Sequence, residues 1–167
     1  HLTTRRQRQM CIRDRDNFKQ VDLIDLVEKA TGSKPIETYI GDINLFAVYD
    51  DESMITNIKP DFDAVSDLDG QGLIISAHSN QYDFVSRYFC PKYGINEDPV
   101  TGSAHTTLIP YWANKLNKDS LTAKQVSKRG GELFCRNLEE RVLIGGNAVL
   151  YMKGIIEINC LIKIIIT

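Results

Sequence analysis

The sequence predicts a strand-dominated α+β domain built around one central helix. Its 167 residues suit a single domain and are enough to bury a substantial core. One apolar segment, 103–116, follows a turn rich in proline and glycine and is long enough for a helix of about three turns. From residue 122 onward, short runs rich in β-branched and aromatic residues follow in quick succession, a pattern typical of strands.

The first half of the chain predicts two helices and two pairs of strands. The elements are, in order, a helix over 21–30, strands over 36–40 and 44–49, a helix over 60–68, and strands over 72–77 and 82–89. The first helix has apolar residues at positions 23, 26, 27 and 30 on one face, and Gly32 supplies its stop signal. The first two strands are expected to form a hairpin through Gly41 and Asp42.

The second half predicts the central helix and then only strands. Thr101 or Ser103 is expected to cap the helix over 103–116. Pro110 falls inside it and is expected to kink the helix or remove one hydrogen bond. The strands predicted after the helix cover 122–127, 131–136, 141–145 and 147–158.

Charge and composition exclude several classes of function. The formal net charge of −2 comes from mixed signs and gives no broad basic surface, so nucleic acid is not an expected partner. The apolar C-terminal stretch is shorter than the about 20 residues that span a bilayer, so no membrane is expected either. The four cysteines are widely spaced without a C-x-x-C pair, which disfavours a zinc site or a disulfide framework and favours a reducing, cytoplasmic location.

The chain divides into three expected regions. Residues 1–15 contain an arginine cluster without apolar periodicity and are expected to be a non-native or disordered arm. A native basic arm that binds RNA or lipid is the alternative. Residues 16–158 are expected to form the folded domain, and residues 159–167 an apolar tail of uncertain origin.

The nine residues 97–105 carry the strongest functional signal. The N–H groups in the first turn of a helix lack partners within the helix, and the helix dipole makes them an anion site. Asp98 lies beside this turn, so a carboxylate acid, base or orienting group is within reach of a bound anion. The alternative is a capped turn in which Asp98 bonds to backbone amides, because Asp, Pro, Thr, Gly and Ser form good turns by themselves.

Three blocks of sequence point to one family. They are SRYFCP (86–91) with GINEDPVTGSAH (94–105) and PYW (110–112), then QVSKRGGEL (125–133), and finally RVLIGGNAV (141–149). Together they resemble the PhzF-like family of phenazine-biosynthesis-type isomerases, which is related in fold to diaminopimelate epimerase. The resemblance implies two similar domains, each a curved, mostly antiparallel sheet or barrel around a central helix, with the active site in the cleft between them. It covers roughly 19–158, so the domain over 16–158 is expected to be the C-terminal half of a family member.

The resemblance also implies a chemistry and its residues. The reaction is proton transfer at carbon without a metal or cofactor, supported by donors that stabilise the developing charge. The matching positions make Asp98 and Ser103 the catalytic residues. The substrate-binding positions are Thr101, Gly102, Ser103, Ala104, His105, Gly130 and Gly131. A structural role is the alternative for the histidine, and a turn or bulge for the last two glycines.

The leading hypothesis is a PhzF-like isomerase half that acts on a small carboxylate-bearing metabolite. The family's proton-shuttling glutamate belongs to the first domain and matches no position here, so the chain alone is expected to be inactive or nearly so. The missing N-terminal domain is the expected partner, and a second copy of the chain, in a homodimer, is another candidate. The alternative is a non-catalytic orphan domain that binds an anion or a partner. A two-thiol racemase is disfavoured because Ser103, and no cysteine, stands at the helix start.

Overall fold

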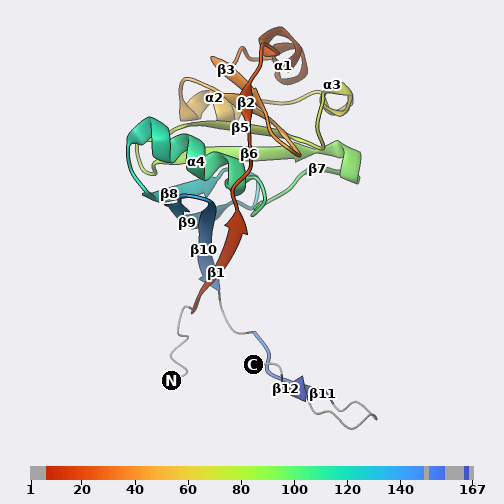
Figure 1. The fold of residues 1–167 in the computed structure, drawn as a ribbon. Coiled ribbons are helices and arrows are strands. Elements are labelled where there is room, and N and C mark those ends of the chain that lie inside the picture. The colour runs from red at the N-terminus through yellow and green to blue at the C-terminus, as the bar shows by residue number, and fades with distance from the viewer. Residues whose placement is uncertain (1–6, 149–150, 157–163, 166–167) are drawn as a thin grey trace.

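Figure 1 shows the computed structural model, which describes residues 7–148, 151–156 and 164–165. The helices are α1 (Ile24–Thr31), α2 (Glu52–Asn57), α3 (Phe62–Asp67), the short 3-10 helix η1 (Pro91–Tyr93) and α4 (His105–Leu116). The strands are β1 (Gln7–Asp14), β2 (Lys19–Gln20), β3 (Glu37–Ile40), β4 (Leu45–Val48), β5 (Leu73–His78), β6 (Phe84–Cys90), β7 (Ile95–Glu97), β8 (Ser120–Gln125), β9 (Gly131–Leu138), β10 (Arg141–Ala148), β11 (Ile155–Ile156) and β12 (Ile164–Ile165). No helix among these residues is long and apolar enough to cross a membrane.

One mixed sheet of ten strands organises the domain. Its order is β1-β10-β9-β8-β6-β5-β4-β3-β2, with β7 pairing beside β6. Within the described residues, β4–β5 and β6–β8 are parallel and the other neighbouring strands are antiparallel. The mostly antiparallel sheet expected from the sequence is therefore confirmed, whereas the two parallel pairings were not predicted. The strands β11 and β12 form a separate antiparallel pair.

The central strands are buried on both faces because helices cover each side of the sheet. Side chains alternate along a strand, so Leu73 and Ile75 of β5 lie in the core under α1, α2 and α3, while Ile74 between them lies in the core under α4. In Figure 1, α1 to α3 and α4 lie on opposite sides of β5 and β6. The strand over 72–77 was predicted from its continuous apolar run, and burial on both faces explains that run.

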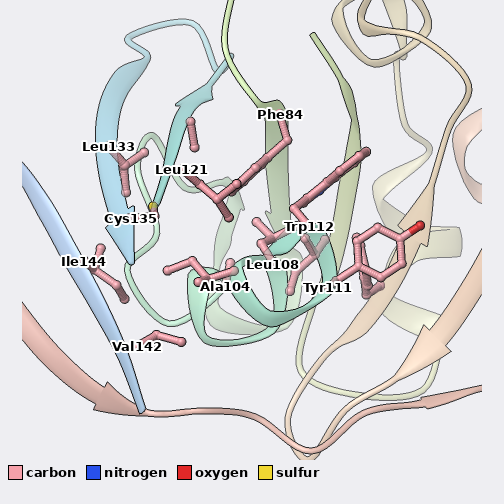
Figure 2. Close-up of a cluster of buried hydrophobic side chains, with 14 of the residues drawn as sticks. Phe84, Ala104, Leu108, Tyr111, Trp112, Leu121, Leu133, Cys135, Val142 and Ile144 are labelled. Atoms are coloured by element: carbon pink, nitrogen blue, oxygen red, sulfur yellow. The ribbon is translucent and has the colours of Figure 1, made fainter. Parts of the chain in front are cut away.

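The helix α4 is the centre of the larger core. Its residues 107–113 are all buried. Figure 2 shows Leu108 and Trp112 of α4 among apolar side chains of the surrounding strands, including Phe84 of β6 and Val142 of β10. The Trp112 ring stacks on that of Phe84 with centroids 5.8 Å apart, and its Nε1–H donates to Ser76 Oγ at 2.9 Å. The helix predicted over 103–116 is thereby confirmed, beginning two residues later than expected.

Pro110 removes one helical hydrogen bond, as expected, and another segment replaces it. Because proline has no N–H, the Thr106 carbonyl four residues earlier has no helical donor. The N–H of Asp16 donates to that carbonyl at 3.2 Å. The Asp16 carboxylate also accepts the Thr107 hydroxyl at 2.6 Å, so the segment before β2 is attached to the helix at the proline.

The predicted helix cap is wrong. Ala104 occupies the N-cap position of α4, and no side chain caps the helix. The Thr101 hydroxyl donates to the Asp98 carboxylate instead. Two backbone hydrogen bonds between residues three positions apart, from His105 N–H to Gly102 O and from Thr106 N–H to Ser103 O, form a tight turn before the helix. The sequence also missed α2, where Asp51 accepts the Ser53 and Met54 amides as an N-cap.

The chain ends differ from expectation where they are described. Residues 7–14, assigned to a disordered arm, form β1 and pair with β10 along its full length. A disordered arm is therefore wrong for these residues, because β10 offers them an edge of unpaired backbone groups. Their non-native origin stays a prediction, and residues 1–6 lie outside the described residues.

The strand expected over 147–158 is wrong as a single strand. β10 continues through Ala148, Tyr151–Gly154 has no regular structure, and Ile155–Ile156 pairs with Ile164–Ile165. Positions 149–150 and 157–158 lie outside the described residues. The apolar tail expected over 159–167 lies mostly outside them too, since only 164–165 is described.

His105 begins α4 entirely inside the core. Its side chain is 0% exposed, and its Nδ1 lies 2.7 Å from the Thr101 carbonyl oxygen. Since a carbonyl only accepts, Nδ1 carries a proton and donates it to Thr101. Burial opposes the charged form and lowers the His105 pKa to about 4. A neutral histidine is therefore a requirement of this helix start.

This histidine makes stability fall in mild acid. The unfolded chain binds a proton near pH 6.5, whereas the folded chain does so only near pH 4. The contribution is fully present above pH 6.5 and is lost as the pH falls toward 4, by about 3 kcal/mol in total. We expect His105→Gln to have a smaller drop in urea-unfolding free energy between pH 7 and pH 4.5 than the unchanged chain. The matched control is His78→Gln at an exposed position; a drop as large in His105→Gln as in this control would contradict the assignment.

Candidate functional site

The loop over 98–104 joins β7 to α4 and is anchored on the central strand β6. The β7–β6 pairing places Glu97 opposite Phe89, and the Asp98 N–H donates to the Tyr88 carbonyl at 3.1 Å. The Glu97 carboxylate forms an ion pair with Arg87 of β6, with N and O 2.7 Å apart. Asp98 therefore leaves the sheet from a fixed position beside its buried centre.

The Asp98 side chain is oriented by the loop itself. The Thr101 Oγ1 hydroxyl donates to Asp98 Oδ2 at 2.5 Å, and Thr101 is buried. Asp98 is partly exposed, and its Oδ1 has no hydrogen-bond partner among the residues that the structure describes. The turn-stabilising alternative, with amides donating to this carboxylate, is not the arrangement found. One carboxylate oxygen is held and the other is free for a ligand or a proton.

Gly102 and Ser103 form the exposed part of the tight turn. No acceptor within the described part of the chain takes the N–H groups of Gly102 and Ser103 or the Ser103 hydroxyl. These donors lie at the N-terminal end of α4, where the helix dipole favours negative charge. The anion site expected from the sequence would use these donors, and it stays a prediction.

The structure places two predicted binding residues in the core instead. Ala104 and His105 are 1% and 0% exposed, so neither side chain reaches the surface of the loop. For His105 this is the structural role that the sequence left open. Thr101 acts through its hydroxyl on Asp98 and through its backbone, because it too is buried.

Gly130 and Gly131 lie against the loop from the β8–β9 turn. Gly130 has φ of +67°, in the left-handed region that favours glycine. A Cβ on Gly131 would come within 2.5 Å of Val100, so the loop packs there because the side chain is absent. Both glycines line a groove of about 520 Å³ together with Gly102 and Val100. Asp98 and Ser103 are not among the residues that line this groove.

Sequence reasoning missed two side chains that hold the loop. Gln125, at the end of β8, hydrogen-bonds to both Asp98 and Thr101, and the Ser127 hydroxyl donates to the Pro99 carbonyl at 2.7 Å. Both residues lie in the second block that resembles the family, but no pattern in that block indicates a contact with residues more than 20 positions earlier. Only the folded arrangement brings them together.

Other chemistry near the loop is limited. Cys90 is 4% exposed, and burial, followed by the nearby Asp98 charge, raises the pKa of its thiol. A neutral, buried thiol acts as a small hydrophobic side chain here. A cavity of about 690 Å³ lies beside the C-terminal half of α4, lined by Glu37, Tyr111 and Lys115 among others, and contains none of the predicted site residues. The described residues contain no group of three or more His, Cys, Asp or Glu side chains suited to a metal ion.

Known proteins are similar to this chain in sequence and in fold. An uncharacterized isomerase of Pseudomonas aeruginosa is 48% identical over 133 residues, which are 80% of this chain and 51% of that protein. An uncharacterized isomerase of Halalkalibacterium halodurans is 38% identical, over 83% of this chain and 52% of its own length. The crystal structure of a PhzF-family phenazine biosynthesis protein from Enterococcus faecalis has a TM-score of 0.82 and 44% identity, covering 86% of this chain and 56% of that one. The chain thus spans about half the length of the relatives it matches.

The family match has its own boundaries. The phenazine biosynthesis-like protein family, PhzC-PhzF, matches residues 8–154. The match begins before the position near residue 19 where the resemblance was expected to start, and it includes most of β1. It also contains the whole loop over 98–104 and its supports in β8 and β9. The chain belongs to the PhzC-PhzF, phenazine biosynthesis-like protein family.

Proposed function

We propose that this chain is the half of a PhzF-like isomerase that binds a small carboxylate-bearing metabolite and supplies one acid/base group. The reaction would move a proton between carbon atoms without a cofactor. The proposal is carried by one observation: the unpaired, exposed N–H groups of Gly102 and Ser103 lie in the same short loop as the oriented Asp98 carboxylate. The name isomerase given to relatives of similar sequence supports the reaction class.

Each part of the loop has a definite chemical task in this proposal. Removing a proton next to a carboxylate or carbonyl places negative charge on oxygen, and fixed N–H donors stabilise that charge without reorganising. Gly102, Ser103 and the Ser103 hydroxyl are those donors. Asp98 exchanges a proton with carbon through its free Oδ1, while the Thr101 hydroxyl holds Oδ2. No step in this scheme requires a metal or an organic group.

A second acid/base group is proposed to come from outside this chain. Proton relocation is easiest when one group removes a proton on one side and another returns it elsewhere. Among the described residues, Asp98 is the only residue whose side-chain carboxylate hydrogen-bonds to the loop. The related isomerases are about twice as long as the matching region, which leaves room for such a group. The chain alone is then a binding half with little activity.

The competing function is a binding domain without catalysis. The groove beside Gly102 has an apolar wall of Val100, Leu133 and Ile144, which suits a partner or an apolar ligand as well as a substrate. A binding domain that takes an anion would use the same loop as the isomerase half. The two functions differ in whether Asp98 moves a proton.

Carboxylate binding is the first test. Succinate added to the ¹⁵N-labelled chain should shift the amide resonances of Gly102 and Ser103 most, because their N–H groups donate to it. Ser103→Ala should weaken succinate binding about tenfold, since a hydrogen bond to a charged group contributes about 1.5 kcal/mol. The control Thr56→Ala removes an exposed hydroxyl from α2 and should leave the dissociation constant unchanged. Equal shifts with uncharged succinamide, or shifts centred elsewhere, would contradict the anion site.

Proton transfer is tested by completing the protein. A chimera joins the N-terminal half of the Pseudomonas aeruginosa relative to this chain in place of the matching half. In D₂O, any small carboxylic acid that the relative deuterates at carbon should also be deuterated by the chimera. Asp98→Asn should lower that rate about 100-fold or more, because it removes an acid/base group. A folded chimera that binds succinate but exchanges no proton, or whose rate ignores Asp98→Asn, would favour the binding domain.

A further inference from the structure

We propose that Gln125 is the positioning residue that holds Asp98 and the N–H donors of the loop in one geometry. The proposal rests on the function proposed above, because it concerns the same loop. Gln125 touches no ligand itself and acts through Thr101 and the backbone of Asp98. Three hydrogen bonds from one buried amide carry this inference.

The amide of Gln125 joins both ends of the 98–101 turn. Its Nε2–H₂ donates to the Asp98 carbonyl at 2.6 Å and to Thr101 Oγ1 at 3.2 Å. Its Oε1 accepts the Thr101 N–H at 2.7 Å. The orientation of the amide follows from these partners, since an N–H only donates and a carbonyl only accepts. A single side chain thus fixes the residue that carries the acid and the residue that orients it.

The same bonds set the direction of the Thr101 hydroxyl, which donates to the Asp98 carboxylate. Thr101 Oγ1 has one hydrogen and two acceptor lone pairs. Because Gln125 donates to Oγ1, the hydroxyl is engaged as an acceptor there and its hydrogen points to Asp98 Oδ2. The chain of donors runs from Gln125 to Thr101 to Asp98, and each bond polarises the next. Asp98 is thereby left with one free oxygen, Oδ1.

Burial and the sheet give Gln125 this influence. The residue is 1% exposed, so no bulk water replaces its amide when the amide is removed. Its backbone lies between two strands, opposite Ser86 of β6 and Gly131 of β9. Gly131 in turn packs against Val100 of the loop. The side chain of Gln125 therefore attaches the loop to a strand that is itself fixed between β6 and β9.

A positioning role and a general contribution to stability predict different local effects. If Gln125 holds the loop, its removal opens the protected amides of Thr101 and His105, whose N–H groups bond to Gln125 Oε1 and Gly102 O. If it only stabilises the fold, these amides change no more than the rest of the core. Hydrogen exchange measures each amide separately and needs no ligand.

The experiment compares Gln125→Met with Thr31→Val in the full chain. Thr31 is also buried and hydrogen-bonded, to Val27 and Tyr49, but lies in the core on the other face of the sheet. In Gln125→Met, the Thr101 and His105 amides should exchange at least tenfold faster relative to amides of the central strand β5, and the succinate dissociation constant should rise at least fivefold. Thr31→Val should change neither the exchange ratio nor the dissociation constant. Uniform acceleration, or an unchanged dissociation constant with succinate bound normally, would overturn the proposal.

A second variant, Gln125→Glu, supplies a rescue that a general loss of stability does not mimic. An ionised carboxylate has no donor for the Asp98 carbonyl, whereas a protonated carboxyl group keeps one O–H donor and one acceptor. The groups that face this position are Asp98 and, across Thr101, His105, which with a pKa of about 4 stays neutral at pH 5. Because burial raises the pKa of a carboxyl group, the introduced glutamate is expected to be protonated at pH 5 and ionised at pH 8. Relative to the unchanged chain at each pH, exchange of the Thr101 amide should therefore be faster at pH 8 and nearly normal at pH 5. Equal ratios at both pH values would count against the donor role.

The outcomes separate this proposal from the proposed function. If the unchanged chain does not bind succinate, the anion site fails, and the exchange of Thr101 and His105 still decides whether Gln125 holds the loop. If succinate binds at Gly102 and Ser103 but Gln125→Met leaves both exchange and affinity unchanged, the function stands and Gln125 is not its positioning residue.

Discussion

The burial of α4 against the sheet is the constraint on which the rest of the molecule depends. A helix of this length with residues 107–113 all buried is stable only where other elements cover it, and the apolar side chains of β6, β8, β9 and β10 provide that cover. Once the position of α4 in the core is fixed, the position of its first residue is fixed as well. The loop over 98–104 must then end against the sheet, between β6 and the β8–β9 turn. The position of the site follows from the packing of the core.

Polar groups inside this core set the rotation of α4 about its axis. Trp112 donates to Ser76, and His105 donates to the carbonyl of Thr101, so one face of the helix has a directed partner at two points that lie about two turns apart. Burial makes an unpaired donor costly, and these two contacts disfavour a helix turned by one residue. Apolar contacts alone would tolerate such a rotation more easily. The same two hydrogen bonds therefore also fix the orientation of the turn that contains Gly102 and Ser103.

The sequence predicts the parts of the fold that depend on near neighbours. Periodicity located α1, the β3–β4 hairpin and α4, and the family resemblance located the loop. The sequence could not predict the parallel β4–β5 and β6–β8 pairings, because these pairings join strands that are separated along the chain by other elements. It missed the roles of Gln125 and Ser127, whose partners lie more than 20 residues earlier. It also wrongly assigned Thr101 as a cap, since the same hydroxyl has Asp98 within reach and binds it instead.

Pro110 has a consequence for how the domain assembles. A helix with an open carbonyl in its middle is a poor autonomous unit, and the N–H that satisfies Thr106 comes from Asp16, in a segment whose side-chain bond to Thr107 spans 91 residues. Closing so long a loop costs conformational entropy before any contact compensates for it. The central helix is therefore not expected to form before the sheet that packs against it. Its completion is coupled to the arrival of the distant segment that contains Asp16, which favours all-or-none assembly over a stable helical intermediate.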